Sequence, residues 1–364
     1  MQINKSNLRR MQAILVSKRF NPGHISHIEA NSRLLEEHGF DVRFSVHDGF
    51  LAFPGCGFKS RLANASDYLH LQAGDLFIVW FPSLSVLLDM LLVRLLTNAT
   101  VVYVYHEPYT SFAAYREAGF SRLKALKVTA ISWVNWLICR LSNKIILPSE
   151  RAFNALPAAR TNADRYAKIN LLFSDEARAG QLSTPRKFIS YIGTIAEDHA
   201  FEEFVRLMHA SICNKTLVPY KFLIATRSHI PERLSSVIEH GVESGRLVVQ
   251  SGTPMSNEQI NSFYAQSFVV WNAYKRSMQS GVLPKAYMFG APVMMSTSNQ
   301  SEYFEEGVHG VLISGDYSTD EFEDAILKMQ SGWQTLSENC RNFFLQNFDY
   351  RALASTYMNF LSAR

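Results

Sequence analysis

Cysteine is scarce in this sequence, and its four copies are far apart. They stand at Cys56, Cys139, Cys213 and Cys340 among 364 residues, with no CxxC or CxxH spacing. Structural zinc sites and disulfide frameworks are recognised by cysteines and histidines at short, regular spacings. The sequence therefore predicts neither a zinc site nor disulfides, and a reducing, cytoplasmic setting fits it.

Long uninterrupted hydrophobic runs are also missing. The apolar stretch at residues 84–96 is interrupted by Asp89 and Arg94, and the apolar run at residues 11–17 is too short for the core of a secretory signal. The formal net charge is only +4, so charge alone does not indicate a nucleic-acid partner. The sequence shows no low-complexity tract or short repeat. The remaining composition is that of an ordinary soluble protein.

Two series of alternating strand and helix patterns run along the chain. The first extends from residues 11–17 to residues 144–150, and the second begins at residues 188–193. With 47% hydrophobic residues, a chain of this length can bury two cores. Such alternation is typical of parallel sheets, whose functional loops follow the carboxyl ends of the strands. We therefore predict an α/β chain of two Rossmann-like domains, although the first series lacks a GxGxxG fingerprint.

A polar, turn-rich stretch separates the two series. It covers residues 170–187, and we interpret it as the linker between domains. The N-terminal domain is accordingly placed at residues 1–173 and the C-terminal domain at residues 187–345. The last segment, residues 346–364, has an amphipathic pattern.

The stretch at residues 268–293 predicts a buried strand, a polar turn and a helix. Its strand is the apolar run FVVWNAY. From Val282 the apolar residues fall at helical spacing, with Pro284 in the first turn and Gly290 after the last. The helix is therefore expected to begin at a Ser-Gly pair.

A helix that begins at Ser280 and Gly281 offers free backbone N–H groups and a partial positive charge. Gly281 would let a ligand approach the backbone, and Lys285 lies one turn further on. These features predict a seat for a phosphate group. An ordinary capped helix with a solvated lysine has the same local pattern, so this alternative stays open.

The segment QSGVLPKAYMFGAPVM, which starts at Gln279, resembles the donor-binding segment of GT-B glycosyltransferases. The resemblance implies two Rossmann-like domains that face each other across a cleft, with the last helix packed on the first domain. Two glutamates eight residues apart frame this helix in family 4, and the aligned positions here are Ser277 and Lys285. A lysine at this place is similar to bacterial exopolysaccharide glucuronosyltransferases, in which it would meet phosphate or an acidic sugar.

The resemblance also implies a set of donor-binding residues. The family's glycine-bearing turn corresponds to Gly193 and Thr194, and its arginine and lysine positions appear as Thr194 and His199. The positive charge that neutralises the diphosphate must then come from other residues. The resemblance also places Glu302 near the ribose. The expected donor site consists of Gly193, Thr194, Arg227, Gln279, Ser280, Gly281, Lys285 and Glu302.

In the first series, the sequence VVYVYHEP places His106 and Glu107 at the carboxyl end of a predicted central strand. Many GT-B enzymes have a histidine or a carboxylate at a corresponding place, so the resemblance implies a catalytic role for this pair. A histidine suits a general base because its pKa is ordinarily near neutral. A strand-end histidine satisfied by the backbone is the alternative.

The loop after the first strand, NPGHISH, contains Gly23, His24 and His27. In GT-B folds this loop faces the cleft, so the three residues are expected to contact phosphate or sugar hydroxyls on the acceptor side. Two histidines three residues apart could also bind a metal. No other ligands cluster near them in sequence, so no metal is predicted.

Residues 116–144 carry six basic residues, one acid and the two tryptophans Trp133 and Trp136. This composition is typical of an amphipathic surface that lies on an anionic bilayer. A helix half buried in the domain core has many of the same residues. In a third arrangement the tryptophans pack inward while Arg122, Lys124 and Lys127 face lipid.

Taken with the resemblance, these patterns predict a hexosyl- or glycuronosyltransferase of bacterial surface glycan biosynthesis. It would move a sugar from a nucleotide sugar, expected to be UDP-linked, to a lipid-linked or polysaccharide acceptor. We expect it on the cytoplasmic face of the inner membrane, with no metal or other cofactor. The alternatives are a catalytically silent homologue that serves as an assembly partner and a nucleotide-sugar epimerase of the same fold.

Overall fold

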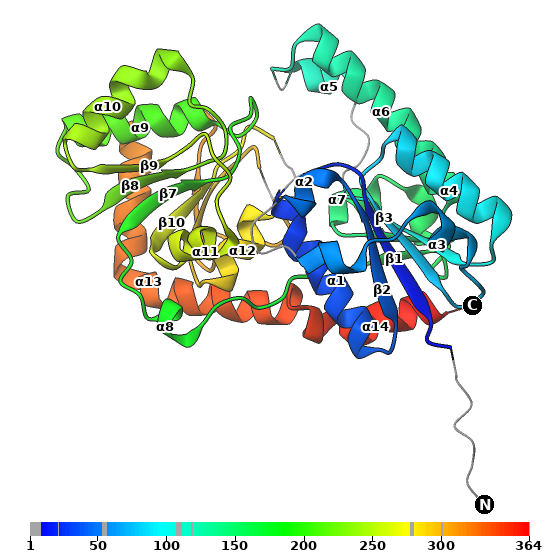
Figure 1. The fold of residues 1–364 in the computed structure, drawn as a ribbon. Helices are drawn as coiled ribbons and strands as arrows, with labels where there is room; N and C mark the ends of the chain where they lie inside the picture. Colours follow the sequence, from blue (N-terminus) through cyan, green and yellow to red (C-terminus); the bar gives the residue numbers. More distant parts are fainter. Residues whose placement is uncertain are drawn as a thin grey trace, which may run out of the picture. The chain divides into compact units, whose positions relative to one another are not determined.

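The computed structural model describes residues 9–20, 22–52, 57–106, 111–117, 119–276, 280–299 and 301–363. The chain forms two compact units (Figure 1). Unit 1 comprises Met1–Phe112, Leu123–Ser174 and Asp349–Arg364, and unit 2 comprises Ala113–Arg122 and Asp175–Phe348. The sequence had placed residues 113–122 in the first domain, whereas the structure groups them with unit 2.

Unit 1 is built on a six-stranded parallel sheet in the order β2-β1-β3-β4-β5-β6. Its strands are short, and β1, β3, β4 and β5 are almost wholly buried, as expected for a sheet with helices on both faces. They are β1 (Gln12–Ser17), β2 (Asp41–Val46), β3 (Leu76–Trp80), β4 (Thr100–Val104), β5 (Lys144–Leu147) and β6 (Tyr166–Lys168).

The helices of unit 1 connect these strands and bury one apolar stripe each. In α4, for example, Val86, Met90 and Val93 are fully buried at helical spacing, and the opposite side is exposed. The elements are α1 (Ile25–Glu37), α2 (Asp48–Leu51), α3 (Ala65–Leu69), α4 (Leu84–Leu96), α6 (Arg122–Leu141), α7 (Glu150–Asn154) and α14 (Tyr350–Ser362), and α5 (Phe112–Glu117) lies at the junction with unit 2.

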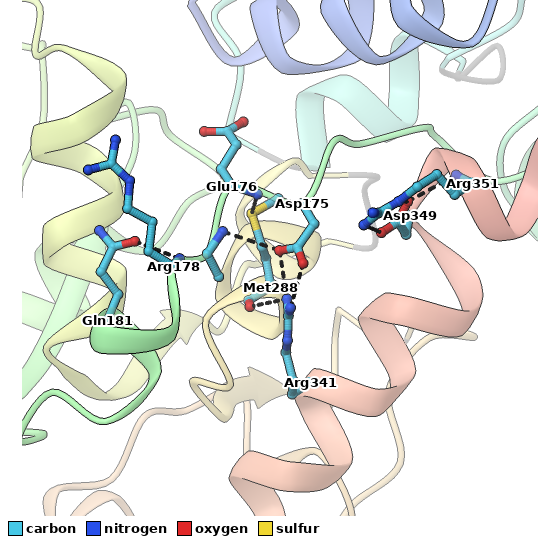
Figure 2. A network of polar contacts seen from close by, with 9 residues as sticks. Asp175, Glu176, Arg178, Gln181, Met288, Arg341, Asp349 and Arg351 are labelled. Carbon is cyan, nitrogen blue, oxygen red and sulfur yellow. Dashed lines mark hydrogen bonds and ion pairs between the residues drawn. The ribbon is translucent and has the colours of Figure 1, made fainter. Parts of the chain in front are cut away.

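The last helix, α14, packs on α1 within unit 1. The Tyr357 hydroxyl lies 2.6 Å from Asn31 Oδ1, and the Tyr350 hydroxyl lies 2.7 Å from Glu37 Oε1. Asp349 begins the helix by accepting a hydrogen bond from the Arg351 amide at 2.9 Å (Figure 2). The chain end is therefore part of the first unit rather than of the second.

Unit 2 has a second six-stranded parallel sheet, in the order β12-β11-β10-β7-β8-β9. Its strands are β7 (Phe188–Ile192), β8 (Lys221–Ala225), β9 (Leu247–Gln250), β10 (Ser267–Asn272), β11 (Val293–Ser296) and β12 (Gly310–Ile313). Its helices are α8 (Ala179–Leu182), α9 (Phe201–Cys213), α10 (Ser235–Glu243), α11 (Asn257–Ala265), α12 (Val282–Met288) and α13 (Thr319–Asn347).

Short 3-10 segments complete the described chain. They are Pro22–His24, Gly57–Arg61, Pro157–Arg160 and Glu232–Leu234. None of the helices in the described ranges is long and apolar enough to cross a membrane.

Each strand order contains one switch point, the place where consecutive connections leave in opposite directions along the sheet. In unit 1 it lies between β1 and β3, and in unit 2 between β7 and β10. Open α/β sheets bind ligands outside the carboxyl ends of the strands at such points. The segments after these four strands are therefore where binding sites are expected.

The stretch that the sequence suggested as a loose linker is anchored to unit 2. Arg341 on α13 holds Asp175 through two hydrogen bonds, of 2.8 and 2.5 Å, and also donates to the Met288 carbonyl at 2.7 Å (Figure 2). The Glu176 amide lies 3.4 Å from Met288 Sδ. Two successive linker residues are thus fixed against α12 and α13.

Candidate functional site

At the switch point of unit 2, the turn after β7 meets the start of α12. Gly193 has φ +144°, a conformation that side-chain-bearing residues rarely adopt. A Cβ atom at this position would lie 3.6 Å from Val282 Cγ2. The Gly193 amide donates to the Ala225 carbonyl at 3.0 Å, which fixes the turn against β8. The structure therefore joins two segments that the sequence had assigned separately to the donor.

The start of α12 is capped from within. Ser280 Oγ accepts a hydrogen bond from the Val282 amide at 3.2 Å and lies 3.4 Å from the Tyr274 hydroxyl. The Lys285 amide donates to the Gly281 carbonyl at 3.2 Å. The helix runs over seven residues, and Gly290 follows it with φ +62°. This matches the strand, turn and helix expected from the sequence.

The Lys285 side chain is buried and paired. Its Nζ lies 2.8 Å from Glu176 Oε2 and donates to Asn261 Oδ1 at 3.2 Å. Asn261 Nδ2 in turn donates to Glu176 Oε2 at 2.8 Å. The interpretation as a solvated lysine is therefore wrong. The positive charge of Lys285, which the sequence analysis assigned to a phosphate, is already compensated by the carboxylate of Glu176 in the linker.

An aromatic stack ties the turn after β7 to the segment after β10. The His199 ring lies on the Tyr274 ring, with centroids 4.5 Å apart and planes 15° apart. His199 Nδ1 is 2.6 Å from the Thr194 carbonyl oxygen, and that oxygen also accepts from the Tyr191 hydroxyl at 2.8 Å. The Thr194 main chain thus has two side-chain partners that hold it in place.

Ion pairs fix the cations of this region. Arg276 Nε donates to the buried Asp198 at 2.7 Å, and Lys275 Nζ lies 2.6 Å from Glu203 Oε1. No pattern in the sequence had indicated Asp198 or Tyr274, because their partners come from different strands of the sheet.

The remaining donor residues are less closely grouped. Arg227 is half-buried directly after β8, and Glu302 is exposed in the loop after β11. Gln279, and Glu107 of unit 1, lie outside the described residues.

At the switch point of unit 1, two histidines pack against Phe81 and a third lies beside one of them. The His24 ring stacks on Phe81 with centroids 3.7 Å apart and planes 13° apart, and His106 lies 5.0 Å from Phe81. The rings of His24 and His27 lie 6.1 and 6.4 Å from that of His106. Phe81 itself has φ +60°, a strained conformation for a non-glycine residue. The sequence had singled out the histidines but not Phe81, which follows β3 just as His106 follows β4.

The electrostatics of His106 differ from the sequence expectation. Loss of solvation, with smaller contributions from His27 and Arg19, lowers the pKa of His106 to about 3. The imidazole is therefore neutral at neutral pH and a weak base, so the expectation of a near-neutral pKa is wrong. Its Nδ1 atom is buried and has no hydrogen-bond partner among the described residues. The alternative of a histidine satisfied at this atom by the backbone is not supported.

Residues 186–331 match the family model for glycosyl transferases group 1. The matched part lies within unit 2. It contains Gly193, the start of α12 and the stack between them. The prediction of a GT-B glycosyltransferase is confirmed for activity class and fold.

Solved structures extend the likeness to the whole chain. HepE from Anabaena, crystallised with UDP-glucose, is 14% identical, with a TM-score of 0.67 over 97% of this chain and 100% of that chain. Sucrose-phosphate synthase from Thermosynechococcus elongatus is 14% identical, with a TM-score of 0.66 over 96% and 98%. A glycosyltransferase from Rickettsia africae is 10% identical, with a TM-score of 0.65 over 97% and 98%. The curated proteins contain no match to the sequence.

The α6 helix of this glycosyltransferase turns its tryptophans to the outside. Trp133 is 68% exposed and Trp136 is 49% exposed, with the Arg140 guanidinium 4.7 Å from the Trp136 ring. The arrangement with inward tryptophans is therefore wrong. Lys144, the last basic residue of the segment, is buried instead, and burial lowers its pKa. Its Nζ lies 4.8 Å from the Phe360 ring centroid.

Proposed function

We propose that this glycosyltransferase moves a sugar from a UDP-linked donor to a lipid-linked or polysaccharide acceptor at a membrane surface. The observation that carries the donor side is that a Cβ atom at Gly193 would lie against Val282, the first residue of α12, inside the matched part of the chain. HepE, a protein of the same fold, was crystallised with UDP-glucose. These two facts support a nucleotide sugar held in unit 2.

The diphosphate would bind where Gly193 approaches Val282. A glycine at this turn leaves room for phosphate oxygens next to the backbone, and the start of α12 contributes the partial positive charge of a helix N-terminus. The Ser280 hydroxyl would bond a phosphate oxygen as well. Such fixed dipoles stabilise the charge that develops on a departing diphosphate, and they do so without a metal.

Lys285 would act by positioning rather than by direct contact. Its pair with Glu176 joins α12 to the linker and to α11 through Asn261. Because the pair is neutral overall, it adds little net charge to the phosphate site. Arg227 is then the cation at the carboxyl edge of the sheet that we propose for the diphosphate, and Glu302 is retained as a candidate for the ribose.

The acceptor side would use the histidine cluster of unit 1. A neutral imidazole both donates and accepts hydrogen bonds, so His106 can bond a sugar hydroxyl without carrying charge. His24 and Phe81 present a stacked pair of rings beside it, and Gly23 and His27 complete the cluster. His106 would therefore orient a hydroxyl group rather than remove its proton.

The exposed face of α6 is the proposed membrane contact. Leu123, Leu126, Trp133, Trp136 and Leu137 are exposed on it, next to the exposed cations Arg122, Lys124 and Lys127. A soluble surface rarely carries so many large apolar side chains on one helix. Tryptophans at the interface and cations toward lipid headgroups fit an anionic bilayer, as on the cytoplasmic face of a bacterial inner membrane.

A donor assay tests the function as a whole. Purified protein is incubated with a panel of nucleotide sugars, with and without membrane extract, and released nucleotide and donor are measured. Nucleotide release that depends on the extract is the expected result. Conversion of the donor without extract would instead identify an epimerase, and no reaction in either arm would favour a silent assembly partner.

A vesicle assay tests the membrane contact separately. The Trp133→Ser/Trp136→Ser variant should lose most of its co-sedimentation with phosphatidylglycerol vesicles. Leu327→Ser, which removes an exposed leucine of α13 in unit 2, is the matched control and should bind as the unmodified protein does. Equal binding of all three proteins would refute the role of this face.

A further inference from the structure

Two neighbouring helices of unit 2 bring two histidines and a cysteine together on their outer surface. His209 and Cys213 stand four residues apart on α9 and so lie on one face of the helix, and His240 comes from α10. One ligand atom from each of the three residues lies within 4.8 Å of the other two. Within the described part of the chain, this is the one group of three potential metal ligands that lie so close together.

We propose that His209, Cys213 and His240 form a binding site for a zinc ion. Zinc is bound by imidazole nitrogen at about 2.0–2.1 Å and by thiolate sulfur at about 2.3 Å in a tetrahedron, so two such ligands lie roughly 3.3–3.8 Å apart. Cys213 Sγ lies 3.6 Å from His209 Nε2, which already fits one edge. Small rotations of exposed side chains bring the third ligand to the same distance.

The ligand types select the metal. A thiolate with two imidazoles suits zinc and other thiophilic metals, whereas magnesium and calcium prefer oxygen ligands. Cys213 is a free, exposed cysteine, and His240 is also exposed, so an ion from solvent can reach them. Three side chains occupy three positions of the tetrahedron and leave the fourth to water. Binding releases the thiol proton of Cys213 to solvent, so affinity should fall at low pH.

The site is separate from the proposed donor site. Cys213 is the last residue of α9, whereas the donor turn precedes the first residue, Phe201. These two ends of a 13-residue helix are about 18 Å apart at 1.5 Å per residue. A bound zinc ion would link the end of α9 to α10 and stabilise that side of unit 2 without taking part in sugar transfer.

Zinc competition with a chromophoric chelator tests the proposal on the full, reduced, metal-stripped chain. The unmodified protein should take up one equivalent of zinc, and Cys213→Ser and His240→Gln should each weaken the affinity at least ten-fold. Cys139→Ser and His70→Gln remove a cysteine and an exposed histidine elsewhere and should leave the affinity unchanged. Circular dichroism of the metal-free variants shows whether each is folded.

Cobalt provides a second readout that needs no activity. The unmodified protein loaded with Co²⁺ should show thiolate-to-cobalt charge-transfer absorption, which Cys213→Ser should remove. Zinc should also raise the thermal midpoint of the unmodified protein but not of the Cys213→Ser variant. Absence of a saturable equivalent, or unchanged zinc affinity in a folded Cys213→Ser variant, would overturn the proposal.

Discussion

The two sheets present opposite chemistry at their switch points. In unit 2 the ends of β7 and β10 lead to a glycine turn and to the start of a helix, where a Cβ atom at Gly193 would touch Val282. In unit 1 the ends of β1 and β3 lead to stacked rings, with His24 on Phe81 and His106 beside them. In the function proposed above, the first switch point would bind a phosphate and the second a sugar. One architecture would then serve two kinds of ligand through the side chains placed on it.

The largest effect is expected from a charge placed at the unit 2 switch point. Ser280→Asp should lower donor affinity by at least about 100-fold, or about 2.7 kcal/mol, because a carboxylate would repel the diphosphate. Aspartate caps a helix as well as serine does, so α12 should stay folded. Calorimetric titration with UDP measures the affinity, and tight binding by this variant would contradict the proposed phosphate seat.

A side chain at the Gly193 turn should have the next largest effect. Gly193→Val must adopt φ +144° and would crowd Val282, so we expect donor affinity to fall on the order of 30-fold, or about 2 kcal/mol. Gly180→Val is the control, because a Cβ atom there meets nothing within 4 Å. UDP titration of both variants separates a local effect from general destabilisation, and equal affinities would count against the site.

A substitution at the unit 1 switch point should lower the turnover rate and leave donor binding unchanged. His106→Phe keeps a ring but removes both nitrogens, and we expect kcat to fall roughly 10- to 30-fold, a loss of about 1.4–2 kcal/mol of transition-state binding. UDP affinity should be unchanged. A loss of UDP affinity with kcat preserved would show that this cluster does not belong to the acceptor side.

The pH dependence of stability offers an independent check on the same residue. Because the pKa of His106 is lowered to about 3, the folded protein binds fewer protons than the unfolded chain between pH 3 and the ordinary histidine value near 6.5. The contribution of His106 to the free energy of unfolding is thus present above about pH 6.5 and is lost as pH falls toward 3. Denaturant unfolding of His106→Phe should show a shallower loss over this range, and identical slopes would contradict the shift.

Within unit 2, the smallest effect on donor binding is expected from the buried pair. Lys285→Met leaves Glu176 without its ion-pair partner and should destabilise the protein by about 3 kcal/mol or more, whereas Lys285→Met/Glu176→Gln should recover most of that loss. UDP affinity of the double variant should change less than about five-fold, measured by titration. A fall in UDP affinity as large as that expected for Ser280→Asp would instead indicate that Lys285 contacts the diphosphate directly.

Much of the fold could be predicted because its signals are local. The strands at residues 11–17 and 188–193 appear where the apolar pattern placed them, as β1 and β7. The start of α12 could also be predicted, from a Ser-Gly pair between a strand and a helix. By contrast, α13 has 29 residues and was not singled out, and the group at His209 was missed although an H-x3-C spacing on a helix marks one face.

The sequence by itself determined the two series of strands and helices, and with them the glycosyltransferase fold, because apolar periodicity and turn residues act over a few positions. Only the tertiary structure decided the partners. Lys285 is paired with Glu176, 109 residues earlier in the chain, and the pKa of His106 follows from burial among rings brought by other loops. Charge compensation and loss of solvation depend on which distant segments of the chain come into contact. A local sequence pattern does not contain this information.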